Sequence, residues 1–430
     1  MDSPQRELAV SIVQKLREQR YEALFAGGCV RDLLLGREPK DYDVATTATP
    51  DQVRALFGRK RTLAVGASFG VIVVLGPQGV PPVEVATFRS EGPYLDGRRP
   101  ESVSYCSPAE DALRRDFTIN GMFYDPVSCR VYDYVGGERD LAARVIRAIG
   151  DPSARMEEGK LRLLRAVRFA SVLDFEIDPT TVSAVREMAS QLNVVSAERI
   201  AQELRRMLVD THRRRAVQLC EDLGLLAVML PEVQLAAAWS AEPSRRGAML
   251  DLLQEPSFEL ALATLLLHLP ARPTAHDICR RLKLSNDETS RTLWLIEHQT
   301  QLDHALNLTK AQLLRILSQR GAPELIALSR ARLLAAGADL QPVLFCEQFI
   351  RETPPELLWP APLVTGDDLV RHGWKPGPQF GPLLDQIRDA QLNGDITTTA
   401  EGLALARRLQ PPGDAAMSAS KASSPETPNV

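Results

Sequence analysis

The spacing of hydrophobic residues changes once along the chain, near residue 150. Before that point, short apolar runs such as 71–75 and 83–88 are separated by turn residues, which is typical of a hairpin. Residues 5–19 repeat apolar positions at helical spacing and predict an amphipathic helix that packs on the first strand. From about 155 to 410 the spacing is almost wholly helical. The pattern predicts an α+β N-terminal part followed by helices.

One segment of the N-terminal part combines two features of phosphate chemistry. An apolar run ends in Gly27 and Gly28 before a short helix, an arrangement that presents backbone amides to phosphate. Asp41 and Asp43 follow, and residues i and i+2 of a strand share one face. Adjacent carboxylates repel each other unless they share a divalent metal. The segment indicates metal-assisted phosphoryl or nucleotidyl transfer, and the alternative is a surface turn with solvated aspartates.

A third carboxylate and a long loop come next in the chain. Glu84 interrupts an apolar strand, and it joins the same site if that strand lies beside Asp41 and Asp43. Otherwise it is a solvent-facing residue of the sheet. Residues 89–112 show no apolar periodicity, so they predict a mobile loop of the kind that often carries function.

A polar cluster then surrounds a short apolar segment. It contains Arg115, Asp116 and Asn120. An arginine can grip triphosphate oxygens in fork geometry, and short polar side chains can reach ribose hydroxyls. The cluster therefore predicts a nucleotide contact, and the alternative is a helix N-terminus with surface arginines.

Three arginines recur at every third position between residues 155 and 169. They are Arg162, Arg165 and Arg168. On a helix this spacing makes one stripe of guanidinium groups, and such a stripe costs stability unless an anion or carboxylates lie opposite it. The stripe predicts an anionic partner, and a solvated helix face is the alternative.

Composition narrows the setting without naming a partner. The chain has 430 residues and a net charge of −4, so a nucleic-acid site would need a local basic surface. Its six cysteines form no Cys-x-x-Cys pair, which favours reduced thiols and a cytoplasmic protein. No apolar run is long enough to span a membrane, and no protein partner is indicated. Residues 411–430 have the composition of a disordered tail.

Taken in order, these segments resemble the family of class II tRNA nucleotidyltransferases (CCA-adding enzymes) and bacterial poly(A) polymerases. The resemblance is carried by 27–32, 41–43, 65–70, 83–89, 114–121, 163–169, 196–204, 362–369, 375–378 and 394–396. It implies a polymerase-β-type head with a mixed sheet at 1–150. A helical neck at 151–215, a helical RNA-binding body at 216–355 and a tail at 356–410 that binds the tRNA elbow would follow.

The resemblance also implies roles for individual residues. Asp41 and Asp43 match the Mg²⁺ ligands, and Glu84 matches the third acidic residue. The phosphate and nucleotide contacts are matched by Gly27, Gly28, Arg31, Arg115, Asp116, Asn120, Arg162, Arg165 and Arg168. The implied activity is template-independent addition of CCA, or part of it, to the 3′ end of tRNA from CTP and ATP, with release of pyrophosphate. Addition of A alone, poly(A) tailing and a catalytically inactive RNA-binding protein remain alternatives.

One position departs from the family pattern. The family's neck motif reads Glu-Asp-x-x-Arg, in which the Asp and the Arg hydrogen-bond the base edge of CTP or ATP. Here Gly159 replaces that Asp, while Arg162 is present. Losing an acceptor for a buried amine costs about 1–3 kcal/mol of base discrimination. Either Glu157 or Glu158 substitutes for it, or base choice is relaxed or narrowed.

Overall fold

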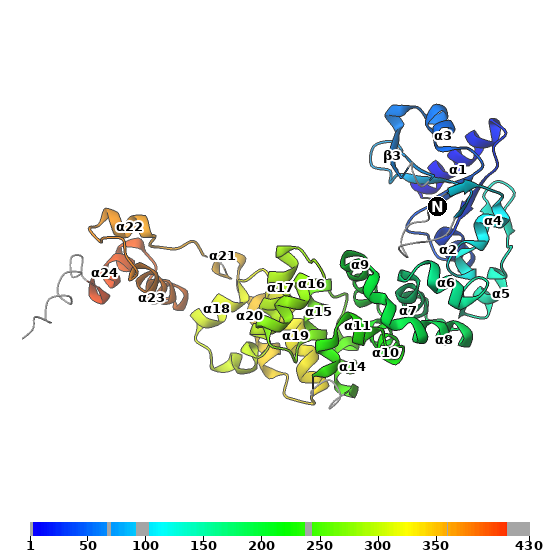
Figure 1. Cartoon of the computed structure of the whole chain (residues 1–430). Helices are drawn as coiled ribbons and strands as arrows, with labels where there is room; N and C mark the ends of the chain where they lie inside the picture. The colour runs from blue at the N-terminus through cyan, green and yellow to red at the C-terminus, as the bar shows by residue number, and fades with distance from the viewer. Residues whose placement is uncertain (1–2, 67–69, 92–102, 237–242, 359, 411–430) are drawn as a thin grey trace, which may run out of the picture. The chain divides into compact units, whose positions relative to one another are not determined.

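The structure, a computed structural model, describes residues 3–66, 70–91, 103–236, 243–358 and 360–410. The predicted disordered tail at 411–430 lies outside these ranges. The chain divides into two compact units, Met1–Thr289 and Ser290–Val430, which are described separately below (Figure 1). The division into head, neck, body and tail stays a prediction.

The first unit begins with a seven-stranded mixed sheet. Its strands, in the order β3-β4-β5-β2-β1-β8-β9, are Thr62–Gly66, Val71–Val74, Val83–Thr87, Asp43–Thr46, Ala23–Ala26, Phe123–Asp125 and Arg130–Tyr132. Only β2 and β5 run parallel, and the other neighbours are antiparallel. The predicted mixed sheet and the hairpin of β4 and β5 are confirmed. Leu24, Phe88 and Phe123 form part of the buried core beside it.

Helices with clear start signals cover this sheet. The helix α1 (Pro4–Glu18) begins after Ser3, whose side chain accepts the Arg6 N–H, and it packs against β1, β2 and β5. The helix α3 (Pro50–Phe57) begins with a capping box and packs against β4 and β5. Shorter elements complete this part: α2 (Gly28–Leu34), η1 (Arg59–Arg61), η3 (Thr118–Asn120) and α5 (Gly137–Ala142).

The prediction that residues 89–112 lack regular structure is wrong at both ends of the segment. Strands β6 (Arg89–Glu91) and β7 (Val103–Tyr105) pair antiparallel, and α4 (Pro108–Leu113) follows. The helix α4 begins with a capping box of Ser107 and Glu110. The spacing of Ser107 and Glu110 could have predicted this helix start from the sequence, but the lack of apolar periodicity over 89–112 favoured a loop. Residues 92–102 lie outside the described ranges.

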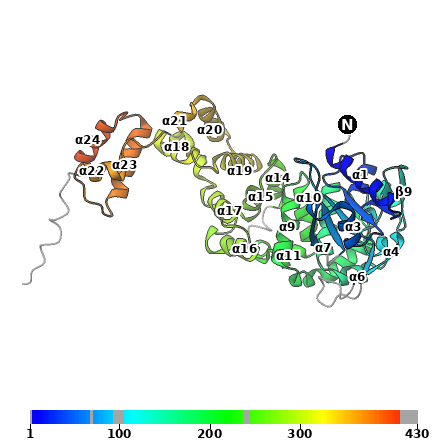
Figure 2. The same ribbon diagram turned by 90° about the horizontal axis from the view of Figure 1, so that it is seen from above.

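The rest of the first unit is helical. Its helices are α6 (Pro152–Glu158), α7 (Leu161–Leu173), α8 (Pro179–Met188), η4 (Ala189–Val194), α9 (Ala197–Leu208), α10 (Arg213–Asp222), α11 (Leu225–Met229), α12 (Pro231–Leu235), α14 (Pro243–Leu252), α15 (Phe258–Leu266), η5 (Ala271–Ala275) and α16 (His276–Arg281). Strands β10 (Val145–Ile146) and β11 (Glu176–Ile177) form a small parallel ladder. The helices α7, α9 and α10 pack side by side (Figure 2).

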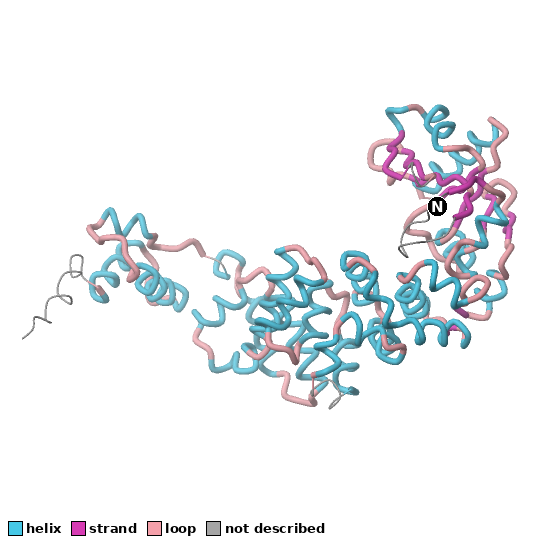
Figure 3. Tube along the Cα trace, in the orientation of Figure 1, coloured by secondary structure: helices cyan, strands magenta, loops and turns pink. Residues whose placement is uncertain are grey.

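The second unit is entirely helical where the structure describes it (Figure 3). The helix α17 (Asn286–His298) leads into it. Its other helices are η6 (Gln301–Asn307), α18 (Lys310–Leu317), α19 (Ala322–Ala335), α20 (Gln341–Glu352), α21 (Pro355–Leu358), α22 (Gly366–Arg371), α23 (Phe380–Asn393) and α24 (Thr399–Leu409). A core around Leu369, Trp374 and Leu383 joins the last three. Across the described ranges, no helix combines the length and the apolarity needed to cross a membrane.

Candidate active site

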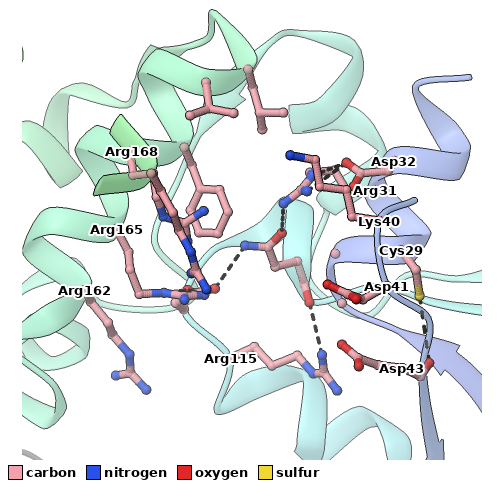
Figure 4. Close-up of a pocket in the computed structure, with 18 of the residues that line it drawn as sticks. Cys29, Arg31, Asp32, Lys40, Asp41, Asp43, Arg115, Arg162, Arg165 and Arg168 are labelled. Carbon is pink, nitrogen blue, oxygen red and sulfur yellow. Dashed lines mark hydrogen bonds and ion pairs between the residues drawn. The ribbon is translucent and has the colours of Figure 1, made fainter. Parts of the chain in front are cut away.

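One cavity of about 930 Å³ brings the predicted segments together. It lies in the first unit, between the sheet, α2, α7 and α9 (Figure 4). Every predicted site residue except Glu84 lines it: Gly27, Gly28, Arg31, Asp41, Asp43, Arg115, Asp116, Asn120, Arg162, Arg165 and Arg168. Segments that are more than 100 residues apart in the sequence therefore share one site.

The predicted glycine turn is present between β1 and α2. Gly27 has φ +72°, a conformation that glycine adopts without steric cost, and it immediately precedes the first helical residue, Gly28. A Cβ at Gly27 would lie 3.1 Å from Nη1 of Arg115. Gly28 and Cys29, the first residues of α2, line the cavity, and the first amides of a helix lack intrahelical acceptors. The turn therefore brings backbone donors and a guanidinium close together.

The two aspartates face the same cavity, but they do not both belong to a strand. The strand β2 begins at Asp43, and Asp41 lies in the bend before it. Between them, Tyr42 is buried and packs edge-on against Phe25, with 5.4 Å between ring centroids. The residues on either side of this anchor, Asp41 and Asp43, both line the cavity.

Glu84 lies beside this pair without lining the cavity. In the parallel pairing of β2 and β5 its register partner is Asp43, so the two strands lie side by side as a third carboxylate would require. Its side chain is exposed to solvent. Glu84 thus lies next to Asp43 in the sheet, and its part in the site stays a prediction.

The electrostatics of Asp43 fit a divalent cation. Burial, together with the charges of Glu84 and Asp41, raises the pKa of Asp43 to about 6, although Arg115 acts in the opposite direction. No group of three or more His, Cys, Asp or Glu side chains in the described ranges could hold a metal by itself. Two carboxylates suit a hard cation that completes its coordination with water and substrate phosphates.

A hydrogen-bonded chain crosses the cavity wall. Arg31 Nη1 donates to Asn120 Oδ1 (2.9 Å), and Asn120 Nδ2 donates to Asp116 Oδ1 (3.2 Å). Arg165 Nε donates to Asp116 Oδ2 (2.6 Å). Burial raises the pKa of Asp116, but Arg165 and the hydrogen bonds lower it more, so the net shift is downward. Asp116 and Asn120 thus hold two arginines in place from opposite ends.

The arginine stripe is confirmed, with a correction to its helix. The segment 155–169 is not one continuous helix, because α6 ends at Glu158 and α7 begins at Leu161. All three arginines lie on α7 and line the cavity. Each meets a carboxylate of the chain: Arg162 meets Glu158 (2.7 Å), Arg165 meets Asp116 (2.5 Å) and Arg168 meets Glu203. Carboxylates of the same chain therefore neutralise the positive charge of the stripe.

An aromatic residue that the sequence analysis did not single out organises these arginines. The guanidinium carbons of three arginines lie close to the centroid of the Phe169 ring: Arg168 at 4.0 Å, Arg165 at 5.0 Å and Arg31 at 5.3 Å. All three distances lie within the range of about 6 Å in which a cation is attracted to the face of an aromatic ring. An aromatic residue directly after a helical arginine stripe was the available signal.

The structure also shows what surrounds Gly159. Glu158 pairs with Arg162, whereas Glu157 pairs with Lys160 (2.6 Å). Gly159 lines the cavity, and neither glutamate does. Glu158 is thus the acid beside Arg162, but no carboxylate of this turn faces the cavity.

Two family models match separate stretches of this chain. Residues 23–147 match the family model described as "Poly A polymerase head domain". Residues 174–236 match the model described as "Probable RNA and SrmB- binding site of polymerase A". The CCA-adding enzyme of Geobacillus sp. (strain WCH70) is 33% identical over 411 residues, covering 91% of this chain and 94% of the relative. That of Levilactobacillus brevis is 33% identical over 414 residues, covering 93% and 97%.

Solved structures agree with these relatives. The crystal structure of Bacillus stearothermophilus CCA-adding enzyme in complex with CTP matches with a TM-score of 0.77 at 30% identity, covering 95% of this chain and 98% of that one. The fold and the site define a nucleotidyltransferase of the polymerase type, a class that generally uses divalent metal ions. The chain belongs to the CCA-adding enzyme family of tRNA nucleotidyltransferases.

Proposed function

We propose that this chain adds CCA to the 3′ end of tRNA from CTP and ATP, with release of pyrophosphate. The observation that carries the proposal is the single cavity in which two acidic residues face a stripe of arginines. The proposal is also supported by two relatives named CCA-adding enzyme, each of which matches more than nine tenths of this chain. The free state of all six cysteines and a tRNA substrate favour action in the cytoplasm.

In this reaction the 3′-hydroxyl of the RNA attacks the α-phosphorus of the nucleotide, and pyrophosphate leaves. Asp41 and Asp43 would hold Mg²⁺, with Glu84 supporting Asp43 from the neighbouring strand. Bound Mg²⁺ supplies charge neutralisation on the triphosphate and lowers the pKa of the attacking hydroxyl. The reaction requires no side-chain nucleophile, so the chain acts by holding both substrates in line.

The arginines supply the anion contacts. Arg31 and Arg115 flank the glycine turn and would bind triphosphate oxygens, and the α2 amides would assist them. Arg165 and Arg168 are held by carboxylates and by Phe169, so little side-chain entropy is lost when a nucleotide binds. Arg162 would contact the base edge.

Primer extension tests the proposal. Substrates are tRNA lacking CCA, tRNA lacking only the final A and an unrelated RNA, each given CTP and ATP separately. We expect addition of C, C and A to the first and of A to the second. Addition of A alone would instead identify an A-adding enzyme, and tailing of the unrelated RNA would identify a poly(A) polymerase. No incorporation despite tRNA binding would identify an inactive RNA-binding protein.

Two variants test the acidic pair. Asp41→Ala or Asp43→Ala should abolish incorporation while tRNA binding persists, because the carboxylates serve the chemistry and not the RNA contact. Asp51→Ala, an exposed aspartate in the first turn of α3, is the matched control and should keep full activity. Substantial turnover in either site variant would refute the assignment.

A further inference from the structure

A buried carboxylate that the sequence analysis did not single out supports two arginines of the cavity wall. Asp111 lies in α4, its side chain is 1% exposed, and it is not among the residues that line the cavity. Arg114 and Arg115 follow it in the chain and do line the cavity. Burying an ionised carboxylate is costly unless cations and N–H donors surround it. The partners of Asp111 therefore show what it holds in place.

One carboxylate oxygen of Asp111 binds the guanidinium of Arg115. Its Oδ2 accepts hydrogen bonds from Arg115 Nε (3.0 Å) and Nη2 (2.9 Å). Two charge-assisted bonds to one edge of a planar guanidinium restrict its position and its orientation. The guanidinium carbon of Arg115 also lies 4.9 Å from the centroid of the Phe123 ring. Arg115 is thus held along one edge and against one aromatic ring.

The other oxygen of Asp111 keeps the carboxylate itself from turning. Its Oδ1 accepts from the backbone N–H of Arg89 (3.1 Å) and from Arg114 Nε (2.9 Å) and Nη2 (2.7 Å). Arg89 begins β6, so Asp111 is tied to a second element as well as to its own helix. Burial raises the pKa of Asp111, but Arg115 and Arg114 lower it more, so the net shift is downward and the carboxylate stays ionised.

The remaining donors of Arg115 are available to a ligand. A guanidinium carries five N–H groups. Asp111 takes one on Nε and one on Nη2, and the backbone carbonyl of Asn120 takes one on Nη1 (3.4 Å). Within the part of the chain that the structure describes, one N–H of Nη1 and one of Nη2 remain. Nη1 lies 3.1 Å from where a Cβ of Gly27 would be, and Figure 4 shows the guanidinium beside Asp43.

We propose that Asp111 is a positioning residue for nucleotide binding, which holds Arg115 in the orientation that binds the terminal phosphates of the triphosphate. The inference deepens the proposed function and rests on it. An arginine that is already held loses less side-chain entropy when the ligand binds. Asp111 does not contact the nucleotide, so its effect on binding passes through Arg115. The alternative is a carboxylate that serves only the stability of the fold, and the two roles predict different results.

A double-mutant cycle in the full-length protein tests the proposal. The probe is pyrophosphate, the product of the proposed reaction, because it lacks the base and the ribose. Asp111→Asn should raise the Kd for pyrophosphate, measured by calorimetry, and the KM for ATP by about 10-fold, the lower end of what a hydrogen bond to a charged group contributes. The KM for tRNA should not change. In an Arg115→Ala background, Asp111→Asn should have no further effect on the Kd, because the arginine to be positioned is absent.

The matched control removes another buried aspartate of the head. Asp125 of β8 has a side chain that is 8% exposed and pairs with Arg17 (2.9 Å), and neither residue lines the cavity. Asp125→Asn should lower the free energy of unfolding and leave the Kd for pyrophosphate unchanged. Asp111→Glu, which keeps the charge but moves it by one methylene, is the second variant and should also weaken pyrophosphate binding. It replaces Asp111→Asn in the cycle if that variant does not fold.

Three results would overturn the proposal. The first is an unchanged Kd for pyrophosphate in the folded variant of Asp111. The second is an equal loss of affinity in Asp125→Asn, which would show general destabilisation. The third is additivity of the two substitutions in the cycle, which would show that Asp111 does not act through Arg115. Absence of nucleotide addition by the unmodified protein would reject the proposed function, whereas pyrophosphate binding still decides the role of Asp111.

Discussion

Restoring the missing acid of the neck turn should sharpen base choice. In the family pattern an Asp occupies the position of Gly159, and its carboxylate accepts the exocyclic amine of C or A. Gly159 has φ −157°, an extended conformation open to any residue. A Cβ there would lie 3.6 Å from Nε of Arg162, an ordinary contact. Gly159→Asp would therefore place a carboxylate beside Arg162 without a clash.

The expected gain is one hydrogen bond to the base. A carboxylate accepts from the amine of CTP or ATP and repels the carbonyl oxygen that UTP and GTP present there. One such acceptor is worth about 1–3 kcal/mol, or roughly 5- to 150-fold in discrimination. Stability should hardly change, because replacing a glycine gains about 0.4–1 kcal/mol and an acid at the end of α6 costs about 0.3–1 kcal/mol.

The assay compares kcat/KM for all four nucleotides on tRNA lacking CCA. Gly159→Asp should lower kcat/KM for UTP and GTP relative to CTP and ATP. Gly159→Asn, which has the same size but an amide that can also donate, is the control and should not reproduce the gain. An unchanged ratio in Gly159→Asp would refute the reasoning, and would show that a carboxylate at this position does not select the base.

Two further predictions concern the head. Without divalent metal, the raised pKa of Asp43 (about 6, from its usual 3.8) means that the folded protein loses stability as the pH rises from about 4 to about 6, because the unfolded carboxyl ionises first. In denaturant unfolding, the free energy of unfolding of Asp43→Asn should rise relative to that of the unmodified protein by up to about 1.4 kcal/mol per pH unit in that window, and no further above it. A difference that stays constant with pH would refute this. Gly27→Ala should lower the unfolding free energy by about 1–2 kcal/mol and weaken ATP binding, because its Cβ meets Arg115. Gly36→Ala has a similar φ (+68°) and open space around it, so calorimetry should find only the stability loss, and equal ATP binding in both variants would refute the contact.

Local features of the fold were predictable because their causes are local. The helix α1 follows from its apolar spacing, and α3 from Thr49 and Pro50 at its start. The turn at Gly27 follows from the glycine that its positive φ favours. The boundaries of the elements were less predictable. Asp41 lies outside β2, and a break at Gly159 separates α6 from α7, which carries all three arginines of the stripe.

By itself, the sequence determined which chemistry the chain can carry and in which segments. Glycines, aspartates and helical arginines can be recognised in the sequence by their residue type and spacing. Tertiary structure alone decided which groups meet. Arg165 pairs with Asp116 across 49 positions and Arg168 with Glu203 across 35, and no periodicity encodes such partners, because they depend on how α7 packs against the head and α9. Arg37 and Lys40 line the same cavity with no side-chain partner among the residues that the structure describes, a difference from the paired arginines that the order of the residues in the chain does not contain.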